Sequence, residues 1–158
     1  MEERQVGVDH LDTLEAMTVL ATLQFSLARY DEAEVLYRQV LTRAERMFGS
    51  DDVATIAALT NLGVLLYTTG RFDEAEPVFL RAISTTDRLY GPGDVSSLAP
   101  TVNLSTIYFA TDRLEEAEPL LTGALDMADR LLGPDHPQTL TITNTLAALY
   151  YNLRRPDE

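Results

Sequence analysis

The 158-residue sequence contains no cysteine, which excludes disulfide bonds and thiolate chemistry. A chain without cysteine fits a reducing compartment best, so we expect a cytoplasmic protein. No apolar run approaches the roughly 18 residues of a membrane span. The N-terminus, Met-Glu-Glu-Arg, also lacks the apolar run of a signal peptide. These absences predict a protein that neither spans a membrane nor carries a secretion signal.

Lysine is also absent, since all 12 basic residues are arginine. Codon bias in a GC-rich genome explains this better than a functional requirement. The 25 acidic residues give a formal net charge of −13. Because phosphate binding requires basic patches, this charge argues against nucleic acid or an anionic membrane as the partner.

The sequence does contain a pattern that returns every 42 residues. Its clearest copy covers residues 71–77 (Arg-Phe-Asp-Glu-Ala-Glu-Pro), and further copies begin at Arg29, Arg113 and Arg155. Other columns keep the same interval, among them Leu20, Leu62, Leu104 and Leu146. A period between about 20 and 50 residues indicates a stacked repeat. We therefore expect one elongated core rather than a compact one.

The period divides the chain into a single array of repeats. Complete repeats cover 8–49, 50–91 and 92–133, while 1–7 aligns with the tail of a preceding repeat and 134–158 forms a partial one. Because both ends fall within a repeat, we expect a fragment of a longer protein. A short natural protein is the alternative.

Each repeat is predicted to hold two amphipathic helices, A and B, because apolar and small residues recur at helical spacing. Helix A is predicted over 11–28, 53–69, 95–111 and 137–153, and helix B over 31–48, 73–90 and 115–132. A glycine ends each helix B, and Asp9, Asp51 or Asp135 can cap the helix that follows. Pro77 and Pro119 are placed in the first turn of helix B, where a missing N–H costs little.

Small residues are needed where helices cross closely, and the column Ala33, Ala75 and Ala117 supplies them in helix B. Tyr37, Phe79 and Leu121 follow these alanines by four residues. They therefore lie on the same helix face and are expected to point into the helix pair.

These residues resemble a known family. The Leu-Ala/Gly pair of helix A, the segment 70–76 (Gly-Arg-Phe-Asp-Glu-Ala-Glu) and the Phe-x-x-Ala of helix B are similar to tetratricopeptide repeats over nearly the whole chain. The usual period is 34 residues, and the longer period here, with residues 133–140, resembles the variant found in kinesin light chains and common in bacterial signalling proteins. Gln24 and Leu66 depart from the pattern, since they replace the tyrosine present at Tyr108 and Tyr150.

The resemblance implies an all-α, right-handed superhelical solenoid of about seven helices, whose A helices line a concave groove. It also implies that the chain binds a peptide, a helix or a protein domain there.

No residues are spaced for catalysis. His10 and His136, the two histidines, occupy equivalent positions about three repeats apart and cannot form a metal pair or a catalytic dyad, so we interpret them as helix-start residues. No serine or threonine has a histidine placed to activate it, and no GxxxxGK phosphate loop occurs. We expect no enzyme activity, no cofactor and no metal.

The candidate site is the predicted groove. Asn61 and Asn103 offer a donor and an acceptor that suit a peptide backbone, although a helix-to-helix hydrogen bond is the alternative. A column of aromatic residues lies about 100° around helix A from its core position, and these rings either face the groove or pack on the next helix A. The proposed groove residues are Phe25, Asn61, Val64, Tyr67, Asn103, Thr106, Phe109, Asn144 and Tyr151.

The expected partner is a protein or peptide that is neutral or basic rather than acidic, because the predicted lining, which also includes Thr18, Thr22 and Thr60, contains no arginine. Two alternatives remain. The chain is either a sensor or regulatory segment of a larger bacterial signalling protein, or an assembly module that forms homo-oligomers through its open ends. For the second alternative the apolar residues of the last helix A are the candidates, namely Leu146, Leu149, Tyr150 and Leu153.

Overall fold

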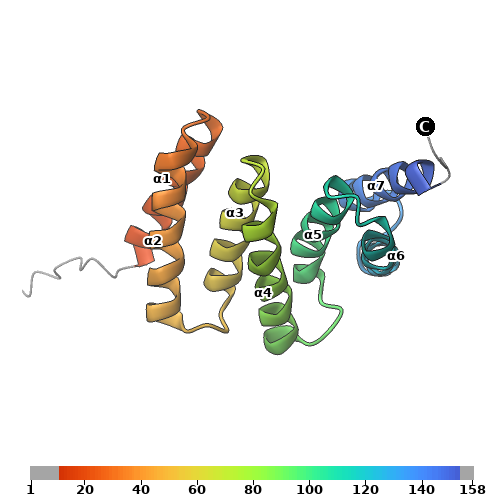
Figure 1. Ribbon diagram of the computed structural model, residues 1–158. Coiled ribbons are helices and arrows are strands. Elements are labelled where there is room, and N and C mark those ends of the chain that lie inside the picture. Colours follow the sequence, from red (N-terminus) through yellow and green to blue (C-terminus); the bar gives the residue numbers. More distant parts are fainter. Residues whose placement is uncertain (1–10, 154–158) are drawn as a thin grey trace, which may run out of the picture.

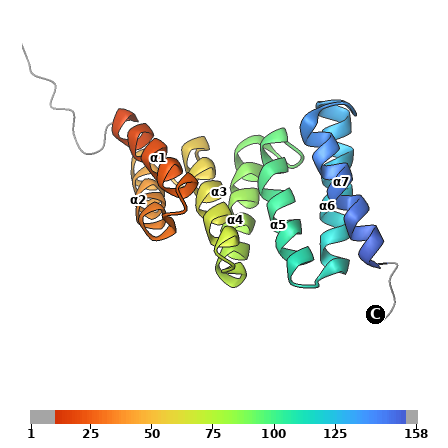
Figure 2. The same ribbon diagram turned by 90° about the horizontal axis from the view of Figure 1, so that it is seen from above.

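The computed structural model describes residues 11–153, which form seven α-helices, one short 3₁₀ segment and no strand. The helices are α1 (Leu11–Ser26), α2 (Tyr30–Phe48), α3 (Val53–Thr68), α4 (Phe72–Tyr90), α5 (Leu98–Ala110), α6 (Leu114–Leu131) and α7 (Pro137–Leu153), with the 3₁₀ segment η1 at Val95–Ser97. Figures 1 and 2 show the helix pairs side by side along the molecule. In Figure 1 α2 is seen along its length but α6 nearly end-on, so successive pairs are rotated. The predicted all-α solenoid is confirmed.

Six of the seven helices begin and end within two residues of the predicted bounds. The exception is the third A helix, in which η1 precedes α5. Asp94 fixes this turn because its carboxylate accepts a hydrogen bond from the amide of Ser96 at 2.9 Å. Pro77 lies in the second turn of α4 rather than the first, because α4 already begins at Phe72. Pro119 has the same place in α6.

The prediction that Asp51 caps α3 is wrong. The helix begins at Val53, so Asp52 is the residue that precedes it, and its carboxylate accepts from the amide of Ala54 at 2.8 Å. Asp51 instead pairs with Arg88 of α4, with its Oδ1 2.6 Å from the guanidinium. The hydrogen bond from Arg88 holds the pKa of Asp51 below its ordinary value. Asp9 lies outside the described residues.

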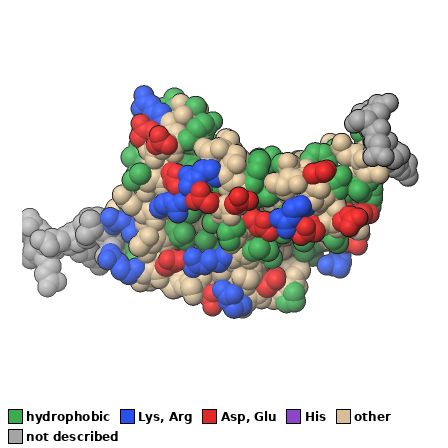
Figure 3. All heavy atoms as spheres, in the orientation of Figure 1, with side chains coloured by type: hydrophobic (Ala, Val, Ile, Leu, Met, Phe, Trp, Pro, Cys, Tyr) green, Lys and Arg blue, Asp and Glu red, His purple; other side chains and the backbone are tan. Residues whose placement is uncertain are grey.

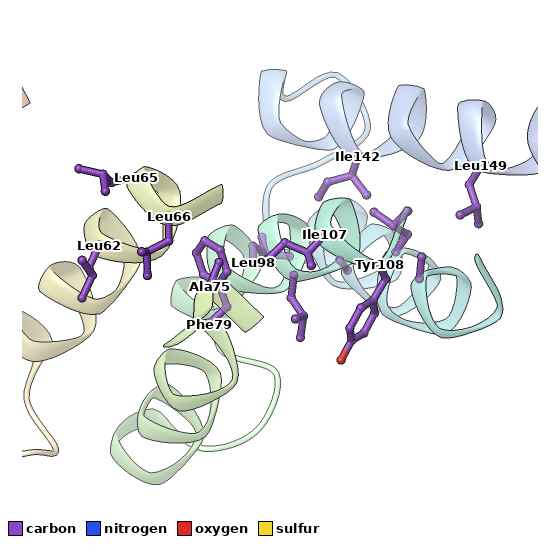
Figure 4. Close-up of a cluster of buried hydrophobic side chains, with 14 of the residues drawn as sticks. Leu62, Leu65, Leu66, Ala75, Phe79, Leu98, Ile107, Tyr108, Ile142 and Leu149 are labelled. Atoms are coloured by element: carbon purple, nitrogen blue, oxygen red, sulfur yellow. The ribbon is translucent and has the colours of Figure 1, made fainter. Parts of the chain in front are cut away.

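The crossings within each helix pair follow the predicted column of small residues. Ala33, Ala75 and Ala117 have no exposed surface, and Tyr37, Phe79 and Leu121 are buried beside them. Figure 4 shows Phe79 of α4 below Ala75, in the cluster formed with Leu62 and Leu66 of α3. Each large side chain contributes roughly 1.5–3 kcal/mol by its burial. The pairs are therefore held by apolar contact along one seam.

Gly63 shows how tightly this seam is packed. A Cβ atom at this position would lie 2.7 Å from the ring of Phe79, closer than carbon atoms can approach without displacement. Phe79 itself has no exposed surface and is enclosed by the core. The absence of a side chain at Gly63 therefore allows α3 to lie directly against the Phe79 ring of α4.

The last helix does not expose the apolar end that the sequence predicted. Leu146 and Leu149 are buried, because α7 packs on the preceding helix α6. Figure 4 shows Leu149 pointing from α7 into the cluster. Tyr150 and Leu153 do remain exposed, at 40% and 38% of their surface. The predicted open end is therefore wrong for Leu146 and Leu149, and self-association stays untested.

Candidate protein-binding groove

The four A helices, α1, α3, α5 and α7, present a nearly uncharged surface. Asp12 and Glu15, both in α1, are the charged residues that they contain. All nine arginines within residues 11–153 lie in α2, α4 and α6 or directly before them. A partner that contacts the A helices therefore meets hydroxyl, amide and apolar groups.

A pocket of about 410 Å³ opens between α1 and α3. Buried Leu14 and Val40 contribute to its lining together with Leu11, and the small residues Ala54, Ala57 and Ala58 leave the space open. Glu15, Thr18, Val19 and Asn61 are the other lining residues within 11–153. Apolar walls with a few polar groups are typical of ligand-binding pockets.

The sequence predicted Thr18 and Asn61 for this groove but not the pocket itself. The available signal was the alanine run of α3, because residues 54, 57 and 58 are all alanine whereas the equivalent residues 42 positions later are Ser96, Ala99 and Pro100. The volume of this pocket depends on the distance between α1 and α3. The sequence of neither helix gives that distance.

The side-chain amides of Asn61 and Asn103 are half-buried on the A helices. Neither amide makes a hydrogen bond to another group within residues 11–153, so the predicted alternative of a helix-to-helix bond is not observed. Both amides retain donors and an acceptor for a partner. Asn61 lies on the rim of the pocket.

The threonine hydroxyls of the groove bond to their own helices. Thr18, Thr60 and Thr106 donate to the carbonyl oxygens four residues earlier at 2.9, 2.9 and 2.8 Å. Since each hydroxyl has one proton, these groups can only accept further hydrogen bonds. These three hydroxyls therefore offer acceptors and no donor.

Two aromatic residues of the predicted column, Phe25 and Tyr67, contact aromatic rings of their own helix pair. The ring of Phe25 meets that of Tyr30 with centroids 5.7 Å apart, and Tyr67 meets Phe72 at 5.6 Å. Tyr30 and Phe72 are the first residues of α2 and α4, so these contacts fix the turn between helices A and B. The sequence analysis did not predict these ring contacts. Phe109 is half-buried against the core in the same way.

The other predicted groove residues differ in their exposure to solvent. Val64 and Thr106 are half-buried on α3 and α5, while Asn144 and Tyr151 are exposed on α7. Only Asn61 of the nine predicted groove residues reaches the pocket.

The B helices carry the charge and use it to connect neighbouring helix pairs. Arg71 contacts Glu34 of the previous pair at 2.6 Å and Glu74 of its own pair at 2.7 Å. Arg113 repeats this arrangement with Glu76 and Glu116 at 2.6 and 2.7 Å. Figure 3 shows arginine and acidic side chains interspersed across the face seen in Figure 1. We call the four contacts of Arg71 and Arg113 the arginine ladder.

The ladder shifts the ionisation of its members. Hydrogen bonds from Arg71 and Arg113 lower the pKa of Glu34 and Glu76 respectively, against the opposing effect of burial. The Tyr108 hydroxyl donates to Glu76 at 3.1 Å, and the Arg113 guanidinium lies 4.1 Å from the centre of the Tyr108 ring. These carboxylates are therefore structural partners of arginine.

No group of three or more potential metal ligands occurs within residues 11–153. His136 lies at the start of α7, where its Nδ1 accepts from the amide of Gln138 at 3.2 Å, and His10 lies outside the described residues. None of the helices described is long and apolar enough to cross a membrane.

A solenoid of antiparallel helix pairs is the fold of a helical repeat scaffold. The sequence pattern of the tetratricopeptide repeat family matches residues 12–88 and 96–158. The chain therefore belongs to the tetratricopeptide repeat family, whose fold is a non-catalytic scaffold for contacts between proteins. No curated protein matches the sequence.

Solved structures show the same fold. The crystal structure of BtubC (BKLC) from P. vanneervenii is similar with a TM-score of 0.81 and 26% identity, over 90% of this chain and 56% of that one. A putative kinesin light chain from Podosopora anserina with nearly identical TPR-like repeats gives 0.79 and 23%, over 87% and 65%. The type III secretion translocator chaperone SycD from Yersinia enterocolitica gives 0.70 and 17%, over 91% and 88%. The chain thus spans less than two thirds of the first two proteins.

Proposed function

We propose that the chain binds a protein segment along its A helices and that one side chain of this segment enters the pocket between α1 and α3. The observation that carries the proposal is the pocket of about 410 Å³ with Asn61 on its rim. Its apolar walls favour an aliphatic or aromatic side chain. The unbonded Asn61 amide is available to the backbone that bears this side chain.

The charge of the groove indicates the kind of segment. Glu15 is the ionisable group of the pocket lining, and the threonine hydroxyls can accept further hydrogen bonds but not donate them. A backbone N–H or a basic side chain satisfies both. We expect a neutral or basic partner. If it is basic, the formal charge of −13 accelerates its association at low salt.

The test uses peptides selected from a random display library on the intact chain. Ala57→Phe fills the pocket from an exposed position, and Ala99→Phe, at the equivalent position of α5, is the matched control. We expect Ala57→Phe to weaken binding about tenfold or more, as for loss of a central contact. Ala99→Phe keeps wild-type affinity. Equal affinity of wild type and Ala57→Phe contradicts the proposal.

The amides are tested with the same peptides and a double variant, Asn61→Ala with Asn103→Ala. Each lost neutral hydrogen bond costs about 0.5–1.5 kcal/mol of binding free energy. Because neither amide bonds within residues 11–153, we expect an unchanged melting temperature. A double variant that unfolds, or that binds as wild type does, shows that the amides are not part of the site.

A further inference from the structure

Ion pairs connect neighbouring repeats along the B helices, but two successive junctions differ in how many they have. Within residues 11–153, four ion pairs connect the segment 34–51 to the segment 71–88. They are Arg38–Glu74, Arg71–Glu34, Arg81–Glu45 and Arg88–Asp51. Between the equivalent segments 42 residues later, Arg113–Glu76 is the ion pair that the described residues form. The junction of α4 and α6 therefore lacks three contacts that the junction of α2 and α4 has.

The difference follows from three replacements at equivalent positions. They are Arg38 by Leu80, Asp51 by Gly93 and Arg81 by Gly123. Asp87 is the equivalent of Glu45, and Arg130 is the equivalent of Arg88. Neither Asp87 nor Arg130 forms an ion pair within residues 11–153. The junction of α4 and α6 thus presents a carboxylate and a guanidinium that can pair with another molecule.

The same junction also presents apolar surface and open space. Leu80 exposes 45% of its surface. Gly123 lies in the interior of α6, where a Cβ atom would meet no neighbouring atom within 4 Å. A glycine with open space beside it lets another molecule approach the helix backbone closely.

Helix geometry relates these positions to one another. Leu80 and Asp87 are seven residues apart, so they lie on the same face of α4 at about 10 Å along its axis. Gly123 and Arg130 have the same spacing on α6. Because Arg81 of α4 reaches back to α2, the equivalent residue Gly123 lies on the side of α6 that faces α4. We call Leu80, Asp87, Gly123 and Arg130 the α4–α6 surface.

The junction of α2 and α4 shows which chemistry fits this surface. There the carboxylate of Glu45 is paired with the guanidinium of Arg81. The carboxylate of Asp87 is therefore suited to a guanidinium, whose N–H groups can meet both carboxylate oxygens. Leu80 is suited to an aliphatic side chain about 10 Å from that guanidinium.

We infer that the α4–α6 surface binds a segment of a partner protein that places an arginine on Asp87 and an aliphatic side chain on Leu80 and Gly123. The inference does not depend on the proposed groove function, because it uses residues of the B helices alone. A carboxylate of the same segment pairs with Arg130, as Asp51 pairs with Arg88.

The test uses peptides from a random display library that bind the intact wild-type chain and are counter-selected on Gly123→Arg. This variant places a guanidinium beside Asp87, as Arg81 lies beside Glu45, and covers the surface. Because the position has open space, its melting temperature should not fall below that of the wild type. We expect the selected peptides to be enriched in arginine and to bind Gly123→Arg roughly tenfold or more weakly.

The charge contact is tested on the selected peptides by calorimetry. Asp87→Asn should weaken binding about two- to fivefold, as for a partly exposed ion pair, and should leave the melting temperature unchanged. Asp129→Asn, at the equivalent position of α6, is the matched control and should bind as wild type does. Ala57→Phe should also bind as wild type does, which separates this surface from the groove.

Three results would overturn the inference. The first is that no selected peptide loses affinity for Gly123→Arg. The second is that Asp87→Asn keeps wild-type affinity, or that its melting temperature falls, which would make Asp87 a structural residue. The third is that sedimentation shows a dimer of the chain alone that Gly123→Arg abolishes, since the surface would then bind a second copy.

Discussion

The A and B helices share one core but differ in their outer surfaces. The four A helices contain two charged residues, Asp12 and Glu15, whereas α2, α4 and α6 contain seven, six and six. The charges of the B helices are arranged as contacts between neighbouring pairs, as in the arginine ladder. The A helices place amides and threonines outward instead. The difference shows that the contacts between charged side chains of neighbouring pairs lie on the B helices, whereas the A helices present hydroxyl and amide groups.

The seam shared by both kinds of helix should show the largest effect on stability. Ala75 has no exposed surface, so Ala75→Leu overpacks the crossing of α3 and α4 and lowers the free energy of unfolding by about 1–3 kcal/mol. Ala57→Leu, on the exposed groove face of α3, should stay within about 0.5 kcal/mol of wild type. Urea denaturation measures both. Equal effects would show that helix pairing has been assigned wrongly.

Glycine-to-alanine substitutions compare how tightly an A helix and a B helix are packed at two chosen positions. In an A helix, Gly63→Ala forces the Phe79 ring to move, and we expect a loss of about 1 kcal/mol even after the better helix propensity of alanine. In a B helix, a Cβ atom at Gly123 would meet no neighbouring atom within 4 Å, so Gly123→Ala should gain up to about 1 kcal/mol. Opposite shifts in melting temperature are the expected result. Stabilisation by both would mean that the seam has spare volume.

The arginine ladder is tested by a double-mutant cycle on Arg113 and Glu76. We expect a coupling of about 0.5–1 kcal/mol in the free energy of unfolding, because the contact is short but partly exposed to solvent. Arg130→Ala is the control, since Arg130 makes no ion pair within residues 11–153. A coupling near zero would show that the contact between Arg113 and Glu76 does not contribute to stability.

The pH dependence of stability gives the smallest effect. The pKa values of Glu34 and Glu76 are lowered in the folded state by Arg71 and Arg113. Their contribution is therefore complete above the ordinary glutamate pKa of about 4.3, and is lost as pH falls through the lowered folded-state pKa. Thermal unfolding of wild type and of Glu34→Gln with Glu76→Gln should differ at pH 7 and converge toward pH 3. A difference that does not change with pH would contradict this assignment.

Most of the fold could be predicted because each feature recurs in several repeats, so every assignment is supported by more than one stretch of sequence. The bounds of α7 match the prediction, and the alanine column is buried at all three positions. The largest error in helix bounds arose where one repeat departs from the others. In the connector before α5, Asp94 caps the 3₁₀ segment Val95–Ser97, which the period could not indicate.

The candidate site was less predictable. Asn61 and Thr18 were expected in the groove. Phe25 and Tyr67 were placed by their helical angle and by the family resemblance, and their rings contact Tyr30 and Phe72. A helical angle gives the direction of a Cα–Cβ bond and does not give the side-chain rotamer. The pocket lining of Leu11, Ala54 and Val40 comes from three helices, so no single sequence pattern contains it.

The sequence by itself determined the period, the helices, their paired packing and the uncharged A surface, because these depend on composition and spacing within one repeat. Only the tertiary structure decided which surfaces remain open. Leu20, Leu62, Leu104 and Leu146 are identical in the pattern, yet only Leu20 is exposed. Burial depends on the neighbouring helix that a position meets, and α1 is the A helix that meets no preceding B helix within residues 11–153.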